Sequence, residues 1–190
     1  MAVEQPPLIA HIIFRLDYGG LENGLVNLIN RIPLERYRHA IICLTDDNPE
    51  FRRRIQQPGV EVFALHKREG HDLRLYGRCW KLLRQLQPAI VHTRNLAALE
   101  MQLPALLAGV RARVHGEHGW DRDPALMNPR HHRLRRWLRP LVQHYIALSG
   151  EIAGYLETRV GVAPARISRI INGVDSVRFH PGSGRSPLPG

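Results

Sequence analysis

The segment from His115 to Asp121 reads His-Gly-Glu-His-Gly-Trp-Asp and gathers imidazole and carboxylate groups into a short stretch of chain. Both groups are zinc ligands, but their spacing fits no closed metal pattern, and Cys43 and Cys79 offer no further ligands. His118 can instead donate a hydrogen bond to a bound sugar or phosphate. The alternative is a histidine that only satisfies nearby backbone groups, and in either case we expect no metal site.

A second candidate loop is Arg15–Asn23, in which Gly19 and Gly20 stand just before a helical pattern. Paired glycines let the backbone approach a ligand closely, and the start of a helix favours a phosphate. The loop is neither G-x-G-x-x-G nor G-x-x-x-x-G-K-[ST], so dinucleotide binding and nucleoside triphosphate hydrolysis are poorly supported. The alternative is a tight turn that needs a positive φ and binds nothing.

Two further segments carry polar groups where strand patterns end. Arg94 could hold an anionic acceptor and Asn95 could bond hydroxyls, although Asn95 could equally cap a helix. Asn172 and Gly173 form a strong turn signal, and Asp175 could fix that turn by accepting hydrogen bonds from backbone amides. By itself this turn indicates only that the chain changes direction.

The segment 130–139 carries five arginines and a tryptophan without a single acid. A basic helix with an aromatic residue could rest on anionic lipid headgroups, each basic residue contributing about 1 kcal/mol. The residues proposed for this contact are Arg133, Arg135, Arg136 and Trp137. Nucleic-acid phosphates are a second possible partner, and a solvated helix face is a third interpretation. We favour the membrane over nucleic acid.

The charge of the whole chain points in the same direction. Its 190 residues, enough for one domain, include 27 Lys and Arg against 17 Asp and Glu, for a net charge of +10. This excess suggests an anionic partner. No apolar stretch approaches the roughly 18 residues of a membrane span, and His11 and Arg15 interrupt the N-terminal apolar run, which therefore does not read as a signal peptide. With two cysteines in apolar settings, we expect a cytoplasmic protein with reduced thiols.

Apolar runs bounded by turn residues alternate with apolar positions at helical spacing. The runs predict strands over 8–14, 39–44, 60–65, 89–92, 112–115, 144–148 and 167–171. The spacing predicts helices over 21–32, 49–57, 72–87, 97–108, 127–138 and 151–159, with Asp72 as a cap, Trp80 facing inward and Pro104 at a kink or late start. This order predicts an α/β fold: a Rossmann-like, doubly wound, mainly parallel sheet with helices on both faces, whose ligands bind at the carboxyl ends of the strands.

Taken together and in order, the loops carry a recognisable set of motifs. They are Gly19-Gly20-x-Glu22, His118-Gly119, Ala147-Leu148-Ser149, Ile171-Asn172-Gly173-Val174-Asp175 and Phe179-x-Pro181. Over residues 8–181 the chain resembles the N-terminal half of a retaining glycosyltransferase of family 4 with the GT-B fold. The sequence of residues 18–28 also resembles that of the sugar transferases associated with exosortase/PEP-CTERM exopolysaccharide systems.

The resemblance implies a role for each motif. Gly19 and Gly20, with Glu22, would face the donor diphosphate, and His118 would lie near the transferred sugar as the catalytic residue. Asn172, Gly173 and Asp175 would mark the crossing into a second domain.

The resemblance also divides the chain: residues 1–181 form the acceptor-side lobe, and 182–190 form a linker towards an absent C-terminal domain that would hold most of the nucleotide-sugar site. The isolated chain would then be inactive. The nucleotide diphosphate sugar is a co-substrate, and no cofactor would be required.

Two other functions stay open at this point. One is a binding module on a Rossmann scaffold for an anionic membrane or nucleic acid, suggested by the net charge and the segment 130–139. The other is half of a GT-B epimerase. In the favoured interpretation a glycan or lipid-linked acceptor lies against this lobe, and the protein works in the cytoplasm with its basic helix on the inner face of the plasma membrane.

Overall fold

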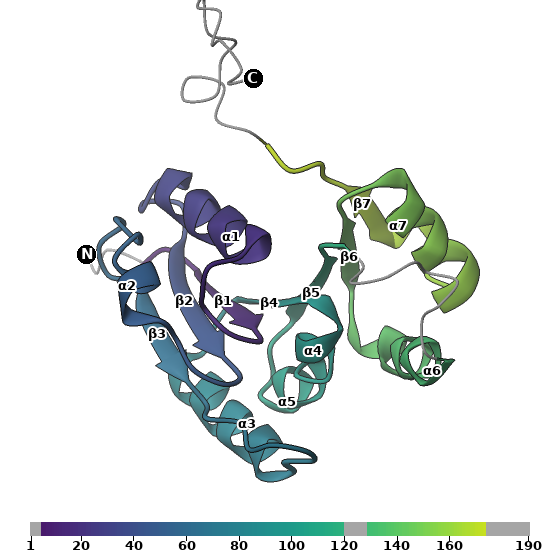
Figure 1. The fold of residues 1–190 in the computed structure, drawn as a ribbon, viewed down its shortest axis with the longest axis horizontal. Helices are drawn as coiled ribbons and strands as arrows, with labels where there is room; N and C mark the ends of the chain where they lie inside the picture. Colours follow the sequence, from purple (N-terminus) through teal and green to yellow (C-terminus); the bar gives the residue numbers. More distant parts are fainter. Residues whose placement is uncertain (1–4, 120–128, 174–190) are drawn as a thin grey trace, which may run out of the picture.

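The computed structural model describes residues 5–119 and 129–173, and these form a single parallel sheet with helices on both sides (Figure 1). The sheet has seven strands in the order β3-β2-β1-β4-β5-β6-β7. They are β1 (Leu8–Ile13), β2 (Arg38–Cys43), β3 (Glu61–Ala64), β4 (Ile90–Arg94), β5 (Ala112–Glu117), β6 (His144–Ala147) and β7 (Ile167–Arg169). Each neighbouring pair is parallel, so the predicted doubly wound α/β fold is confirmed.

The strand order reverses between β1 and β4. From β1 the chain first builds outward through β2 and β3, and it then returns to add β4 on the other side of β1. In an open parallel sheet the loops diverge at such a reversal and leave a crevice at the carboxyl ends of the strands. The fold therefore places its natural binding position beside the ends of β1 and β4.

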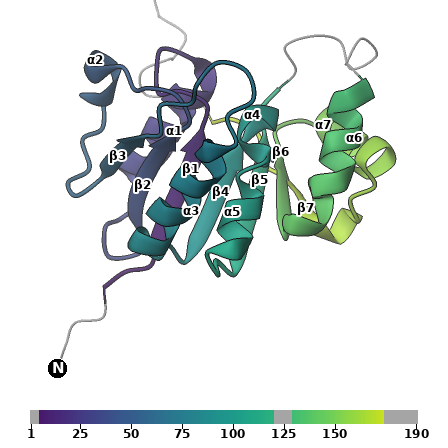
Figure 2. The same ribbon diagram turned by 90° about the horizontal axis from the view of Figure 1, so that it is seen from below.

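Helices connect the strands and cover the sheet. They are α1 (Gly20–Arg31), α2 (Pro49–Arg52), α3 (Arg74–Leu86), α4 (Asn95–Leu99), α5 (Gln102–Leu107), α6 (Pro129–Leu138) and α7 (Gly150–Tyr155). In Figure 1 the sheet runs between α1 on one side and α3 and α5 on the other, and Figure 2 shows α3 and α5 side by side along the strands. Within the two described ranges, no helix has the length and apolarity needed to cross a bilayer.

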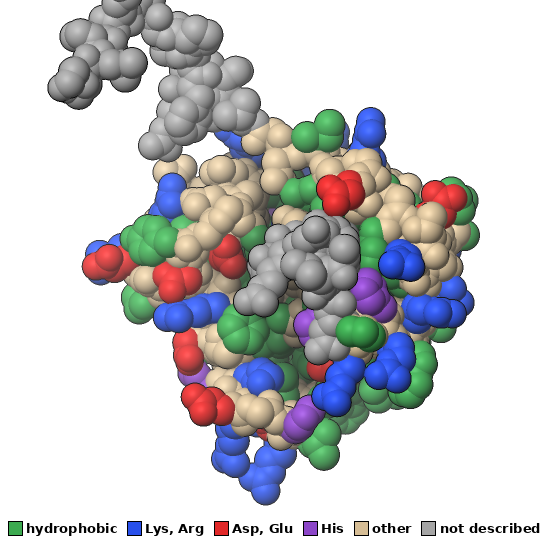
Figure 3. All heavy atoms as spheres, turned by 45° about the vertical axis from the view of Figure 1, so that its right-hand side comes forward, with side chains coloured by type: hydrophobic (Ala, Val, Ile, Leu, Met, Phe, Trp, Pro, Cys, Tyr) green, Lys and Arg blue, Asp and Glu red, His purple; other side chains and the backbone are tan. Residues whose placement is uncertain are grey.

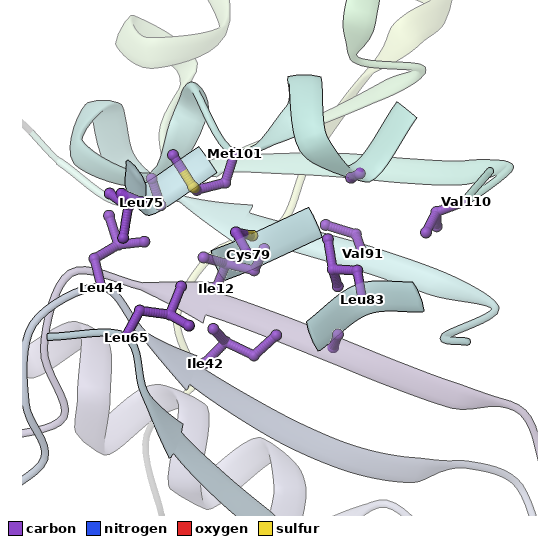
Figure 4. Packing of buried hydrophobic residues seen from close by; sticks show 13 residues of the cluster. Ile12, Ile42, Leu44, Leu65, Leu75, Cys79, Leu83, Val91, Met101 and Val110 are labelled. Carbon is purple, nitrogen blue, oxygen red and sulfur yellow. The ribbon is translucent and has the colours of Figure 1, made fainter. Parts of the chain in front are cut away.

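The core has two layers because the central strands are buried on both faces. On one face Ile12 and Ile42 pack with Cys79 and Leu83 of α3 (Figure 4). On the other face Ile41 belongs to a cluster that includes Leu25 and Ile29 of α1. Such strands read as continuous apolar runs, which is why they are visible in the sequence.

Three predicted helices differ from the structure. The helix predicted over 49–57 is only the four-residue α2. The helix predicted over 97–108 is divided into α4 and α5, because Pro104 lacks an N–H and is accommodated in the first turn of a new helix. The helix over 151–159 is α7 followed by a π-helical turn, Leu156–Val160.

Two side-chain predictions on α3 are wrong. Trp80 is 44% exposed, because it lies one residue beyond the buried stripe of Leu75, Cys79 and Leu83 and is rotated about 100° away from it. Asp72 is not the cap, since Leu73 holds that position without a side-chain bond. Instead the Asp72 carboxylate accepts hydrogen bonds from the Arg68 backbone N–H and the Arg78 guanidinium.

Removing the side chain of Leu83 tests the core between α3 and the sheet. Leu83 is 1% exposed, so Leu83→Ala should lower the free energy of unfolding by about 2–5 kcal/mol in urea denaturation. The matched control is Leu107→Ala, whose leucine is 66% exposed and whose change should stay within about 0.5 kcal/mol. Equal losses for the two variants would contradict the described packing of α3.

Candidate functional site

The carboxyl ends of β1, β4 and β5 bring together most of the residues singled out in the sequence. The β4 register places His92 beside His11 of β1 and Arg94 beside Gly116 of β5. Three loops therefore meet at one edge of the sheet, and they contribute the Gly19–Gly20 pair, Asn95 and His118. This edge is the reversal point of the strand order, where such folds bind ligands.

The glycine loop leads directly into α1 without a left-handed residue. Gly19 is the N-cap with extended backbone (φ −165°, ψ 161°), and Gly20 is the first helical residue. The alternative of a tight turn that needs a positive φ is therefore wrong for this pair.

The two glycines differ in their surroundings. The Glu22 carboxylate occupies the position that a Cβ on Gly19 would take. Among the described residues, no heavy atom lies within 4 Å of a Cβ built on Gly20. A side chain at Gly19 would therefore require the Glu22 carboxylate to move, whereas the backbone at Gly20 stays open at the start of a helix, where N–H groups lack intrahelical partners.

The sequence pattern places Arg94 in the loop after the fourth strand. In the structure Arg94 is instead the last residue of β4. Its side chain is only 4% exposed, and its Nη1 lies 3.3 Å from Nε2 of His118. Its buried Nε has no hydrogen-bond partner within residues 5–119 and 129–173. Burial lowers the pKa of Arg94 to about 10, and the Glu22 carboxylate acts in the opposite direction. The guanidinium is therefore charged, lies beneath the loops, and has Glu22 as its counter-charge.

Gly116 and Asn95 determine the position of His118. A Cβ built on Gly116 would lie 2.7 Å from Nε2 of His118 and 3.0 Å from Nε2 of His92, so a side chain here would displace the His118 ring from its observed position. The backbone N–H of His118 donates to Oδ1 of Asn95 at 2.8 Å. Directly after it, Gly119 has a φ of 131°, a conformation that favours glycine.

Asn95 does not cap a helix. It is the first residue of α4, where Arg94 is the N-cap, and its φ of 57° is the left-handed conformation that asparagine tolerates. Its side chain instead anchors the His118 loop.

The imidazole of His118 is neutral in the pH range of most enzymes. Burial lowers its pKa to about 3, and the positive charge of Arg94 contributes in the same direction, followed by His115. At neutral pH the His118 ring can therefore donate one hydrogen bond and accept another, but it carries no positive charge.

A row of buried histidines, not recognised in the sequence, crosses the sheet towards the site. Nε2 of His11 lies 3.1 Å from Nδ1 of His39, and the ring centroids of His11 and His92 are 5.8 Å apart. Burial lowers the pKa of His11 and His92 well below the usual value, and the charge of Arg94 adds to this shift. In the sequence these histidines lie within apolar strand patterns. Such a position indicates that they are buried, but it does not show that they contact one another.

A buried ion pair fixes the end of β5. Glu117 accepts hydrogen bonds from Nε and Nη2 of Arg135 at 2.6 and 3.1 Å, and from Nε2 of His115 at 3.3 Å. Burial alone would raise the pKa of Glu117, but the hydrogen bonds from His115 and Arg135 outweigh it and lower the pKa to about 2. In the described part of the chain, no three His, Cys, Asp or Glu side chains are grouped as a metal site would require.

This ion pair shows that one residue predicted to contact a membrane, Arg135, is in the wrong place for that role. Arg135 is 5% exposed and points into the protein, so it cannot contact lipid. Arg133 and Arg136 are exposed, and Trp137 is 81% exposed. The charge pattern alone could not show which arginine of α6 pairs with the distant Glu117.

The remaining predicted residues lie towards the C-terminal end. Asn172 and Gly173 are exposed and stand at the end of the described segment. Asp175, Phe179, Pro181 and the predicted linker 182–190 lie outside the described residues. Ser149 is the N-cap of α7, where its Oγ accepts a hydrogen bond from the backbone N–H of Ile152 at 3.1 Å.

Comparisons with known proteins agree with the fold. The sequence profile of Glycosyltransferase Family 4 matches residues 18–178. No curated protein matches the chain at the sequence level.

Several solved structures share the fold at low sequence identity. A glycosyltransferase from Rickettsia africae has a TM-score of 0.72 at 14% identity, covering 97% of this chain and 47% of its own. Anabaena HepE in complex with UDP has a TM-score of 0.68 at 18% identity, covering 88% and 44%. The lipopolysaccharide outer core galactosyltransferase WaaB has a TM-score of 0.66 at 15% identity, covering 88% and 46%. The chain thus spans less than half the length of each of these proteins.

The buried histidines predict a loss of stability in mild acid. His11 and His92 stay neutral in the folded chain, whereas an unfolded histidine binds a proton below about pH 6.5. Their contribution is complete above that pH and is lost as the pH falls, by up to about 1.4 kcal/mol per pH unit for each histidine. Urea denaturation at pH 7.5 and 5.5 should show this loss.

Substitutions identify the histidines responsible. His92→Gln should make stability less dependent on pH, whereas His131→Gln, which replaces an exposed histidine of α6, should leave that dependence unchanged. The same stability at both pH values would contradict the assignment of neutral buried rings.

Proposed function

Because this chain belongs to Glycosyltransferase Family 4, we propose that it is the acceptor-side lobe of an enzyme that transfers a sugar from a nucleotide diphosphate sugar with retention of configuration. The observation that carries the proposal is the convergence of the glycine loop, Arg94 and His118 at one edge of the sheet. A basic module that binds only a surface would not need this arrangement. The resemblance of residues 18–28 supports a role in exopolysaccharide synthesis with a glycan or lipid-linked acceptor.

In this proposal the glycine loop binds the donor diphosphate. The open backbone at Gly20, at the start of α1, suits an anion, since a helix start carries partial positive charge. Preorganised backbone amides stabilise the charge that develops on the leaving diphosphate. The solved complexes of HepE with UDP and with UDP-glucose support a nucleotide sugar as partner for this fold. No metal or other cofactor is needed for this role.

His118 would donate a hydrogen bond to the transferred sugar or to the donor phosphate. Its neutral state suits this role, since a bond to a hydroxyl needs no charge. Asn95 holds the loop that presents His118 and would shape the acceptor side of the site, while the buried Arg94 would act on the acceptor through its contact with His118.

A second, donor-binding lobe would complete the site. The fact that this chain spans less than half of its structural relatives supports a two-lobed enzyme. Asn172 and Gly173, at the end of the described segment, and Asp175 beyond it would form the crossing, with 182–190 as linker. Such an enzyme would work in the cytoplasm, where nucleotide sugars are made.

Substitution of Gly20 tests the diphosphate site in the full-length enzyme. Because the space around Gly20 is open, Gly20→Val should fold normally but obstruct the diphosphate. The valine side chain would hold the diphosphate away from the backbone N–H groups; losing the contact of one donor with a developing anion costs about 10²–10³ in rate, so kcat/KM should fall about 10²-fold. The assay is release of nucleoside diphosphate from UDP-glucose, dTDP-glucose and GDP-mannose.

The matched control is Gly24→Ala, in the same helix and equally open. It should keep full activity and gain about 0.5–1 kcal/mol of stability. Unchanged turnover in Gly20→Val would remove the loop from the donor site. Nucleoside diphosphate release at enzymatic rates by the 190-residue chain alone would contradict the two-lobed proposal.

We also propose that the outer face of α6 rests on an anionic membrane. Arg130, Arg133, Arg136 and Trp137 follow each other at helical spacing, so they share one side of α6, opposite the buried Arg135. Figure 3 brings this part of the molecule forward and shows Lys and Arg side chains lying close to hydrophobic ones. An exposed tryptophan among arginines suits the interface between headgroups and acyl chains.

Charge reversal on α6 tests this contact. Each basic residue near an anionic surface contributes about 1 kcal/mol, so Arg133→Glu with Arg136→Glu should weaken binding to phosphatidylglycerol vesicles at least roughly thirtyfold. The charge-matched control is Lys81→Glu with Arg84→Glu on the exposed side of α3. Vesicle cosedimentation that falls equally in both double variants would show that net charge alone governs binding, and would contradict a specific α6 contact.

A further inference from the structure

The contact between Arg94 and His118 determines where His118 carries its proton. A guanidinium has only N–H donors and no acceptor. Nη1 of Arg94 lies 3.3 Å from Nε2 of His118, so Arg94 must be the donor and Nε2 the acceptor. An imidazole nitrogen that accepts a hydrogen bond carries no proton, and the neutral ring therefore has its N–H at Nδ1.

The surroundings of His118 hold the ring in this orientation. Nε2 faces inward, over Gly116 and close to Nε2 of His92. Asn95 fixes the backbone of His118 by accepting its N–H. Among the hydrogen bonds between described residues none uses Nδ1 of His118, so within those residues this nitrogen has no partner.

Arg94 is itself too deeply buried to bind a ligand as an open clamp. Its side chain is 4% exposed, and its Nε lacks a partner in the described ranges. The Glu22 carboxylate, which comes from the glycine loop, interacts electrostatically with it and favours its charged form. The influence of Arg94 on a ligand therefore passes through His118.

We propose that Arg94 is a positioning residue that fixes His118 as the Nδ1–H tautomer, so that His118 presents a donor to an acceptor oxygen of the bound ligand. The identity of the ligand in this proposal rests on the proposed function. The proposal adds that the ligand atom bonded to His118 is a hydroxyl or phosphate oxygen that accepts a hydrogen bond. Arg94 also couples the first turn of α1 to His118, because the Glu22 carboxylate favours its charged form and His118 contacts it.

The charged and titratable groups around His118 favour the same neutral donor. After burial, Arg94 and His115 disfavour the protonated ring, whereas Glu117 alone favours it. His92, whose pKa is itself lowered, lies beside it. His118 thus acts as a hydrogen-bond donor of fixed direction and not as a general acid.

Two-bond ¹H–¹⁵N NMR of the histidine rings tests the tautomer in this chain without any substrate. Wild-type His118 should show the pattern of a protonated Nδ1 and an unprotonated Nε2. Arg94→Lys keeps a charged donor and should retain this pattern, whereas Arg94→Met removes the donor and should shift the ring towards the Nε2–H form. His132, whose Nδ1 lies 2.7 Å from the Tyr155 hydroxyl, should be unchanged in each variant and reports that the fold is intact.

The result that overturns the proposal is an Nε2–H tautomer in the wild-type spectrum, which requires no variant to fold. An unchanged Nδ1–H pattern in folded Arg94→Met would also overturn it. In the full-length enzyme Arg94→Met should lower kcat/KM by up to about 10²-fold, with Arg94→Lys close to wild type. The predicted tautomer in an enzyme that transfers no sugar would contradict the proposed function while supporting this inference.

Discussion

The ion pair between Glu117 and Arg135 fixes the end of β5 to α6 at the point where the site begins. A buried carboxylate is costly unless its partners are well placed, and removing one partner of such a pair costs about 3–5 kcal/mol. Here two hydrogen bonds from Arg135 and one from His115 satisfy Glu117 and tie the end of β5 to α6. Because His118 is the next residue, the position of its ring depends on this anchored strand end.

The chain is strongly basic, yet the site uses little of that charge. His11, His92 and His118 are all kept neutral by burial, and Arg94 is the cation around which they are arranged. The proposed diphosphate contact needs only backbone amides. The arginines Arg133 and Arg136 of α6, by contrast, are exposed on an outer surface. The net charge and the site are therefore two separate features of the protein.

Much of the fold could be predicted because buried parallel strands are continuous apolar runs, as in residues 8–14 and 39–44. The predicted alternation of strands and helices also places the glycine loop and His118 at the same end of the sheet. Residue-level partners could not be predicted, because they join positions far apart in the sequence. Arg135 pairs with Glu117 across a loop, and no local pattern separates it from the exposed Arg136. Likewise, His11 and His92 became neighbours only through the register of β1 and β4.

The absence of a side chain at Gly116 determines where the rings beside it can lie. Its missing side chain is the space in which the rings of His92 and His118 meet, and even one added carbon would lie within 3.0 Å of both. A side chain at this position would therefore displace one or both rings. The direction in which His118 faces a ligand thus depends on a residue that touches no ligand itself.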